Sequence, residues 1–255
     1  MTTDRRVLIH PDKQSLAGAV AARFITKVVD LLDECDEVTI VLTGGSVGIA
    51  VLAAINESPA KNMIQWPRLN FWWGDERFVA KNDPERNELQ ARKALLDHLS
   101  VDETKVHPFP AADEIADLDQ AAAAYARELA DAADEGKKFP RFDITFLGVG
   151  PDGHIASLFP GLPGSTETEA TVVAVRNSPK PPPLRLSLTL PVIQSSERVW
   201  VVLAGADKAS ALGLALAGAS IEEVPVAGAT GRKRTVFFVD REAAAEVPEA
   251  LIAPS

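Results

Sequence analysis

The sequence predicts an α/β fold, in which helices cover both faces of a mostly parallel, Rossmann-like sheet. Two observations predict it. Short runs rich in β-branched, aliphatic and aromatic residues alternate with longer runs whose apolar residues recur at helical spacing. Glycine-rich or charged clusters directly follow four of the short runs, as expected where parallel strands end at one edge of a sheet. With 255 residues, 46% of them hydrophobic, the chain can bury a sizeable core.

The first part of the chain alternates between strands and helices. The composition of buried strands is found at residues 6–10 (RVLIH), 37–42 (EVTIVL) and 69–73 (LNFWW). Apolar residues repeat at the spacing of one helix face after the first strand, and similar patterns follow the other two. The helices expected in this part span residues 15–35, 47–57 and 88–99.

The second part continues the alternation. Strands are expected at residues 142–147 (FDITFL), 171–175, 199–203 (VWVVL) and 235–240 (TVFFVD). Helices are expected at residues 117–134, 206–217 and 242–247. Two stretches rich in proline and glycine, 159–164 and 178–183, are expected to form loops over a site. The chain shows no internal repeat and no long linker, so we expect one domain over residues 1–255, with a small lid at 160–190 as an option.

Composition and charge argue against several classes of function. A net charge of −10 disfavours binding along a nucleic-acid backbone, and the single cysteine, Cys35, excludes an intrachain disulfide. Residues 1–13 lack the apolar core of a signal peptide, and no apolar run approaches the ~18 residues of a membrane span. We therefore expect a cytoplasmic protein that does not bind membranes. We expect a monomer, with a dimer as the alternative.

The four histidines lack the H-x-x-x-H and H-E-x-x-H spacings of zinc sites. Asp152 and His154 could supply two ligands, but the sequence offers no clear third one. We therefore expect neither a metal nor another cofactor.

The TGGS cluster, residues 43–46, lies between an expected strand and an expected helix. Gly44 and Gly45 allow a tight turn with exposed N–H groups, and the helix start adds a positive dipole end, which together favour a phosphate site. An ordinary turn with Ser46 as the helix cap is the alternative. Residues 44–48 also match G-x-S-x-G, so a serine esterase that uses Ser46 is a further alternative.

Charged residues also follow two other expected strands. In GDER, residues 74–77, alternation along the chain would point Asp75 and Arg77 into a shared cleft; a surface ion pair is the alternative. Lys208, at the start of an expected helix, and Arg185, between apolar neighbours, are candidates to hold an anion. For Lys208 the alternative is an exposed lysine, and for Arg185 it is a protein carboxylate as the anion.

The stretch GVGPDGHIASLFPG, residues 148–161, matches the G-x-G-x-x-G dinucleotide fingerprint. That fingerprint must open a helix, and here Pro160 and Gly161 would end any helix within about two turns. The stretch is better interpreted as a sharp loop that carries Asp152 and His154. A histidine titrates near neutrality and suits general acid–base chemistry, and a nearby carboxylate can orient it. A structural histidine is the alternative.

At these residues the chain resembles the 6-phosphogluconolactonases, members of a wider group that includes the glucosamine-6-phosphate isomerases and deaminases. The matching stretches run in family order from about residue 40 to 215: LTGGS, WWGDERFV, FDITFLGVGPDGHIASLFPG, PPPLRLSLTLP and LAGADKASAL. The resemblance implies a fold of the glucosamine-6-phosphate isomerase-like type. It implies a carboxylic ester hydrolase that converts 6-phospho-D-glucono-1,5-lactone to 6-phospho-D-gluconate in the oxidative pentose phosphate pathway.

The resemblance also implies roles for individual residues. His154 would be the general base that activates water, and Asp152 would orient or polarise it. Arg77 would hold the substrate or stabilise developing charge, while Asp75 matches the carboxylate that moves protons in the isomerase relatives. The residues implied to bind the phosphate lie in the TGGS turn and at two cationic positions: Thr43, Gly44, Gly45, Ser46, Arg185 and Lys208.

One departure separates the two branches of the group. The amino-sugar isomerases carry a loop similar to GHIAFNEPG, with a glutamate where this chain has Phe159. GDER likewise replaces a DEY-type sequence. The missing carboxylate favours addition of water to a carbonyl. A phosphosugar isomerase or deaminase remains the nearest alternative, and a non-catalytic phosphosugar sensor is another.

Overall fold

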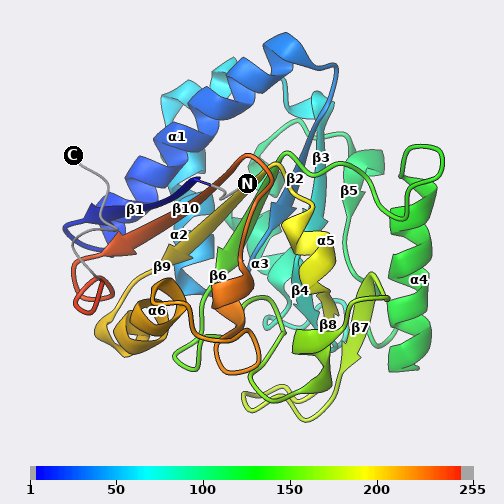
Figure 1. The fold of residues 1–255 in the computed structure, drawn as a ribbon. Coiled ribbons are helices and arrows are strands. Elements are labelled where there is room, and N and C mark those ends of the chain that lie inside the picture. The colour runs from blue at the N-terminus through cyan, green and yellow to red at the C-terminus, as the bar shows by residue number, and fades with distance from the viewer. Residues whose placement is uncertain (1–3, 248–255) are drawn as a thin grey trace.

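The computed structural model describes residues 4–247, and its largest feature is a seven-stranded sheet (Figure 1). The strand order is β1-β10-β9-β6-β2-β3-β5, and every neighbouring pair is parallel, which confirms the predicted fold class. The first three and last eight residues of the predicted domain lie outside the described part. The strands of this sheet are β1 (Asp4–His10), β2 (Val38–Leu42), β3 (Leu69–Trp73), β5 (Val106–His107), β6 (Ile144–Gly148), β9 (Arg198–Leu203) and β10 (Arg234–Asp240).

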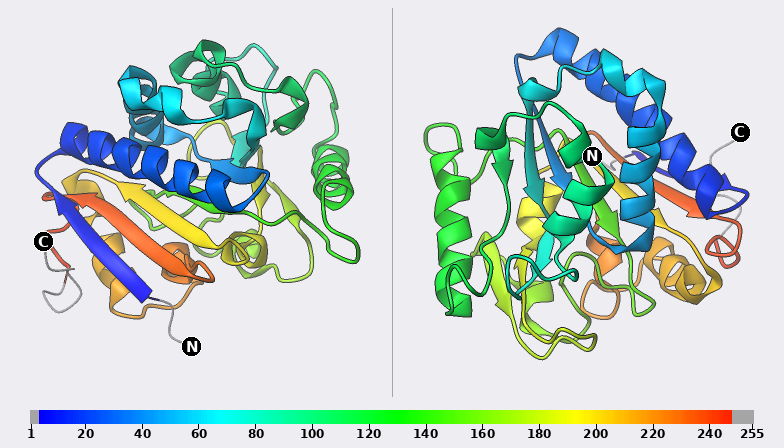
Figure 2. Two further views of the ribbon diagram at one scale, coloured as in Figure 1. Left: turned by 90° about the horizontal axis from the view of Figure 1, so that it is seen from above. Right: turned by 180° about the vertical axis from the view of Figure 1, so that it is seen from behind.

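Helices cover both faces of the sheet (Figures 1 and 2). The first three helices, α1, α2 and α3, lie on one face, whereas α5 and α6 lie on the other; α4 lies beside a smaller sheet. The helices are α1 (Lys13–Glu34), α2 (Gly45–Glu57), α3 (Asn87–Ala94), α4 (Leu118–Asp131), α5 (Leu190–Gln194) and α6 (Ala209–Leu216).

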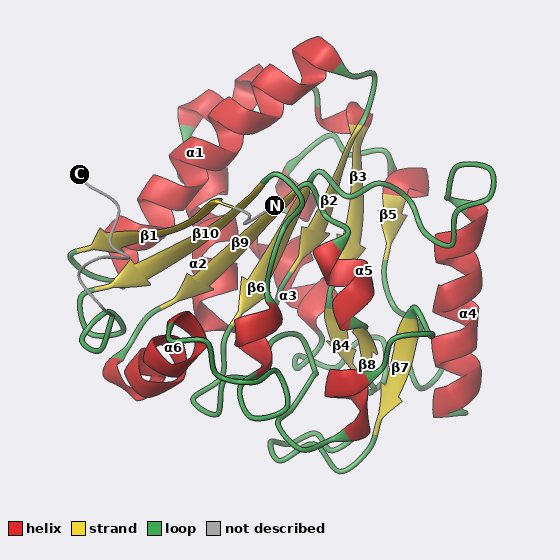
Figure 3. Cartoon of the chain, in the orientation of Figure 1, coloured by secondary structure: helices red, strands yellow, loops and turns green. Residues whose placement is uncertain are grey.

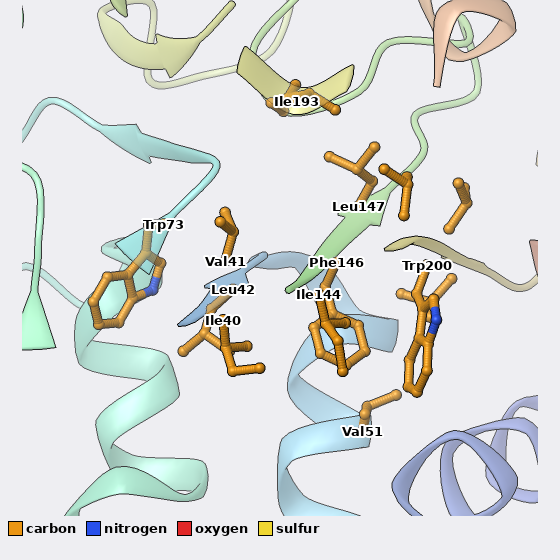
Figure 4. Packing of buried hydrophobic residues seen from close by; sticks show 14 of the residues in the cluster. Ile40, Val41, Leu42, Val51, Trp73, Ile144, Phe146, Leu147, Ile193 and Trp200 are labelled. Carbon is orange, nitrogen blue, oxygen red and sulfur yellow. The ribbon is translucent and has the colours of Figure 1, made fainter. Parts of the chain in front are cut away.

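Burial on both faces explains why the strands read as continuous apolar runs instead of alternating ones. In Figure 4, Ile144 and Phe146 of β6 point towards Val51 of α2, while Leu147 points towards Ile193 of α5. All five side chains are buried. The central strands are therefore fixed between two apolar layers, and the turns that follow them start from defined positions.

A second sheet of three antiparallel strands continues from β3. Its order is β4-β8-β7, formed by β4 (Asp75–Arg77), β7 (Val172–Val175) and β8 (Arg185–Leu188). Gly74 joins the sheets, because its N–H donates to Leu42 in β2 at 3.0 Å and its carbonyl accepts from Leu188 in β8 at 2.8 Å. Long loops gather at the carboxyl ends of the large sheet, in the lower part of Figure 3.

Several predicted elements need correction. The expected helix at 242–247 is wrong, because this stretch forms turns in which Asp240 accepts the N–H of Ala243 at 2.8 Å. Pro248 follows it in the sequence and disfavours a helix at the preceding residue. The expected helices at 88–99 and 206–217 are each divided, with a short 3₁₀ turn at one end. The expected strand at 171–175 is β7 of the small sheet.

Candidate active site

A cavity of ≈ 450 Å³ opens at the carboxyl edge of the large sheet. Along the chain, β2 is followed by β3 on one side, while β6 is followed by β9 on the other, so the strand order reverses between β2 and β6. Such a reversal point is where ligands bind in open α/β sheets. All four clusters that were predicted to converge contribute to the lining of this cavity: Thr43–Ser46, Asp75, Arg77, Gly148–Gly150, His154, Ala204, Asp207 and Lys208.

A larger cavity of ≈ 930 Å³ lies elsewhere, between α4 and β7. Alanines and valines line it together with charged side chains that lie apart from the predicted clusters, and it contains none of the predicted site residues. Size alone does not identify a site, because a specific pocket needs convergent polar groups. The smaller cavity has these groups and is the candidate active site.

His154 and Asp152 form a close pair in the loop after β6. His154 Nδ1 lies 2.5 Å from Asp152 Oδ1, and the imidazole is 14% exposed. Burial alone would raise the pKa of Asp152, but the hydrogen bond and charge of His154 outweigh it and hold that pKa at about 2. An ionised carboxylate can only accept, so Nδ1 carries the hydrogen of this contact, and in the neutral tautomer that donates from Nδ1 the lone pair lies on Nε2. The pair has the geometry of an oriented general base.

Gly150 makes room for this pair. A Cβ built on Gly150 would lie 2.1 Å from both Cε1 and Nδ1 of His154, which no side chain tolerates. The loop continues through turns and isolated β-bridges, without a helix between residues 149 and 162. This agrees with the interpretation that the G-x-G-x-x-G spacing is not a dinucleotide fingerprint.

The TGGS turn brings the start of α2 to the cavity. Gly44 is the residue that caps α2, and among the described residues no side-chain hydrogen bond caps this helix. Ser46 is therefore not the cap, contrary to the alternative interpretation. It is exposed in the first turn and lines the cavity. Thr43 Oγ1 accepts the N–H of Gly148 at 3.2 Å, which ties the turn after β2 to the end of β6.

Asp75 and Arg77 of β4 both face the cavity, as strand alternation predicts. Asp75 Oδ2 accepts from Ser157 Oγ at 2.7 Å, and Asp75 Oδ1 accepts from Asn87 Nδ2 at 3.3 Å. Arg77 Nη1 donates to the carbonyl of Glu85 at 2.5 Å. Within the described residues neither side chain forms a salt bridge, so the alternative of a surface ion pair is not supported.

Glu76, between these two residues, points away from the cavity and is fully buried. Its carboxylate accepts the N–H groups of Asn87 and Glu88 at 2.7 and 2.9 Å and so caps α3. Burial raises the pKa of Glu76 to about 7, while Arg86 and the backbone donors act in the opposite direction. Along β4 the side chains thus alternate: Asp75 and Arg77 face the cavity, and Glu76 faces α3.

Arg185 and Lys208 supply positive charge at the cavity. Arg185 is 5% exposed and donates to the carbonyls of Lys180, Pro181 and Pro182, at 3.1 to 3.2 Å. Its predicted anionic partner is thus not a protein carboxylate among the described residues. Lys208 pairs with the neighbouring Asp207, and this hydrogen bond lowers the pKa of Asp207. Lys208 ends a 3₁₀ turn and directly precedes α6.

Three further residues reach the site without having been predicted. Lys180 lines the cavity from the proline-rich loop, Asn87 lines it from the first position of α3, and Ser157 binds Asp75. The lysine within NSPKPPP, five residues before Arg185, was the available signal for the loop. Sequence gives no comparable signal for Asn87 or Ser157, because their role depends on contacts with β4.

The described part of the chain offers neither a cluster of metal ligands nor a helix fit to span a membrane. Between residues 4 and 247 no group of three or more His, Cys, Asp or Glu side chains has the arrangement of a metal site. In the same range, none of the helices has both the length and the apolar character needed to cross a membrane.

Comparison with known proteins identifies the family. The family described as glucosamine-6-phosphate isomerases/6-phosphogluconolactonase matches residues 11–238. The 6-phosphogluconolactonase of Streptomyces coelicolor is 49% identical over 259 aligned positions, covering 100% of this chain and 99% of that protein. The 6-phosphogluconolactonase of Mycobacterium tuberculosis is 45% identical, and the alignment covers 94% of this chain and 97% of that protein. The structure of 6-phosphogluconolactonase from Trypanosoma brucei superposes with a TM-score of 0.84 at 27% identity. The superposition covers 97% of this chain and 100% of that one. The chain therefore belongs to the family of glucosamine-6-phosphate isomerases and 6-phosphogluconolactonases.

Proposed function

We propose that this protein hydrolyses 6-phospho-D-glucono-1,5-lactone to 6-phospho-D-gluconate, a reaction of the oxidative pentose phosphate pathway. The observation that carries the proposal is the His154–Asp152 pair, which faces a cavity that also contains cationic side chains and the start of α2, where Gly44 provides no side-chain cap. Relatives with 45–49% identity over nearly the whole chain carry the name 6-phosphogluconolactonase, which supports it.

The phosphate of the lactone binds at the glycine-rich turn. The first N–H groups of α2, at Gly44–Ser46, can donate to phosphate oxygens, and the helix dipole favours the negative charge. Thr43, Arg185 and Lys208 surround the same cavity, and the two cations add charge-assisted hydrogen bonds. The phosphate then displaces Asp207 from Lys208. Anchoring one end of the substrate places the lactone carbonyl near His154.

His154 acts as the general base in the chemical step. Nε2 takes a proton from water as the water oxygen forms a bond to C1, and the carbonyl electron pair moves onto the carbonyl oxygen. Arg77 and backbone N–H groups of the loop stabilise this oxyanion. The carbonyl re-forms, the bond from C1 to the ring oxygen breaks, and the proton returns to that oxygen. The products are a carboxylic acid, which ionises, and a free hydroxyl. Asp75 accepts hydrogen bonds from sugar hydroxyls with its remaining lone pairs.

A lactonase assay on freshly generated 6-phosphogluconolactone, with the spontaneous rate subtracted, tests the proposal. We expect turnover above the spontaneous rate that a chelator does not reduce, and a clear preference over the unphosphorylated gluconolactone. Turnover restored only by added metal would contradict the proposed water activation. Equal rates on both lactones would contradict the phosphate site. Absence of turnover would contradict the function itself.

The nearest alternative is a deaminase or isomerase of amino-sugar phosphates. Phe159 occupies the position where those relatives carry a glutamate, and its side chain is 1% exposed and apolar. We therefore expect no release of ammonia from glucosamine 6-phosphate in a coupled assay. A serine esterase is not supported either, because within the described residues Ser46 makes no hydrogen bond to His154. A serine-directed phosphonate should leave the activity unchanged.

A further inference from the structure

Asn87, the first residue of α3, is buried at the back of the cavity and is 1% exposed. Its amide nitrogen lies 2.9 Å from the backbone carbonyl of Asp75 and 3.3 Å from Asp75 Oδ1. Both neighbours are acceptors, so the atom that faces them must be the donor, which fixes the orientation of the amide. Asn87 is therefore a neutral double donor to one residue of the site.

The amide oxygen of Asn87 has no hydrogen-bond partner in the described part of the chain. It lies against Gly44, where an added Cβ would be only 1.9 Å from it. A buried acceptor without a partner carries a free-energy cost, and a contact with a Cα–H group offsets only part of it. The amide oxygen of Asn87 is thus in an unfavourable environment, whereas its amide nitrogen forms two hydrogen bonds to Asp75.

Two more hydrogen bonds connect this arrangement to its surroundings. Glu76 accepts the backbone N–H of Asn87 at 2.7 Å, so the start of α3 is fixed to β4. On the other side, Ser157, in the loop that carries His154, donates to Asp75 Oδ2 at 2.7 Å. Each oxygen of the Asp75 carboxylate thus receives a hydrogen bond from a different element. The orientation of Asp75 depends on α3 and on the catalytic loop together.

We infer that Asn87 is a positioning residue, which orients the Asp75 carboxylate in the cavity and links it to the glycine turn at Gly44. This inference rests on the proposed function, in which Asp75 binds the sugar. Asn87 need not touch the substrate, because its amide oxygen is covered by Gly44 and its nitrogen by Asp75. Its effect on the reaction is expected to pass through Asp75.

The test uses Asn87→Ala, which removes the donor, and Asn87→Asp, which keeps the size but turns an acceptor towards Asp75. We expect kcat to fall on the order of 10²-fold, because a sugar held by a misoriented Asp75 presents its carbonyl out of line with His154. KM for the phosphorylated lactone should stay close to the wild-type value, because the groups proposed to bind the phosphate still anchor the substrate. In an Asp75→Ala background, which has already lost the oriented carboxylate, Asn87→Ala should cause no further loss.

The matched control is Asn70→Asp in β3, since Asn70 also donates to a carboxylate, Glu37, at 2.8 Å, but far from the cavity. It should leave both kcat and KM unchanged. Wild-type kcat in both Asn87 variants, an effect on KM alone, or an undiminished loss in the Asp75→Ala background would overturn the inference. Failure of both variants to fold would assign Asn87 a structural role and would also overturn it. If the wild-type protein does not hydrolyse the lactone, the proposed function fails instead.

Discussion

The imidazole of His154 lies 4.4 Å from the ring of Phe159, centroid to centroid, with the two planes tilted by 42°. The guanidinium carbon of Arg185 lies 5.8 Å from the centroid of the same ring. An apolar ring thus contacts both the proposed base and a proposed phosphate ligand. Here the amino-sugar isomerases have a carboxylate, so the two branches differ in the group beside the histidine.

Replacing this ring should therefore affect the lactonase. Phe159→Glu would bury a carboxylate beside His154 and Arg185, where it would compete with the phosphate for Arg185. We expect the cost of burying the charge to lower the melting temperature, together with a large loss of kcat. Phe159→Leu keeps an apolar group and should retain most of the stability. Steady-state kinetics and thermal melts check both variants. Full activity of Phe159→Glu would show that the apolar ring is not required.

His154→Ala removes the proposed base. We expect kcat to fall by about 10²- to 10⁴-fold while KM changes little, because the groups proposed to bind the phosphate remain. His98→Ala is the control, since the exposed His98 contacts the carbonyl of Lys93, at 3.0 Å, in a turn that lies outside the cavity. Turnover close to wild type in His154→Ala would remove the histidine from the mechanism.

The pH dependence of stability should reveal the His154–Asp152 pair. The pKa of Asp152 is lowered from 3.8 to about 2, so its contribution is present above pH 3.8 and is lost as the pH falls through about 2. The difference in melting temperature between wild type and Asp152→Asn should therefore shrink between pH 4 and 2. In a His154→Ala background the same comparison should show a smaller difference. A difference that stays constant down to pH 2 would contradict the pairing.

Lys208→Ala removes one proposed phosphate ligand. We expect KM for the phosphorylated lactone to rise about 10- to 100-fold, the usual value of a hydrogen bond to a charged group, with little change for the unphosphorylated lactone. The control is Lys27→Ala, since Lys27 also pairs with a nearby aspartate, Asp30, at 2.8 Å, but on α1. An equal effect on both lactones would place Lys208 outside the phosphate site.

Gly150→Ala tests the packing of the catalytic loop. The new Cβ would overlap the imidazole of His154, so the ring must move, and a displaced base should reduce kcat on the order of 10²-fold. Gly18→Ala is the matched control in α1, where an added Cβ has no atom within 4 Å, and it should raise stability by about 0.5–1 kcal/mol. Unchanged kcat in Gly150→Ala would show that the loop adapts.

The sequence was most informative where structure follows from local pattern. Apolar runs alternating with helical spacing predicted the parallel sheet, and parallel strands bring their carboxyl ends to one edge, so the four clusters were expected to meet. Asp152 and His154 are only two residues apart, so their contact could also be predicted from the sequence. These features depend on short-range sequence and on general rules of α/β topology.

Features that depend on tertiary contacts were not predicted. β4 and β8 carry charged residues that were interpreted only as site residues, and their pairing joins chain segments more than 100 residues apart. The burial of Asn87 depends on its fit between Gly44 and Asp75, and Lys180 is held over the cavity by Arg185. The helix expected at 242–247 was wrong for a different reason. The alanine-rich composition favoured a helix, and the proline that follows, which disfavours one, was not taken into account.

Gly74 has a mechanical consequence for substrate entry. The N–H of Gly74 donates to Leu42 in β2, and the carbonyl of Gly74 accepts from Leu188 in β8. The two walls of the cavity are thereby crosslinked at the base, and they cannot rotate apart as separate bodies without breaking both bonds. We expect admission and release of the sugar to depend on the loop that carries Lys180, with the sheets behaving as a fixed frame.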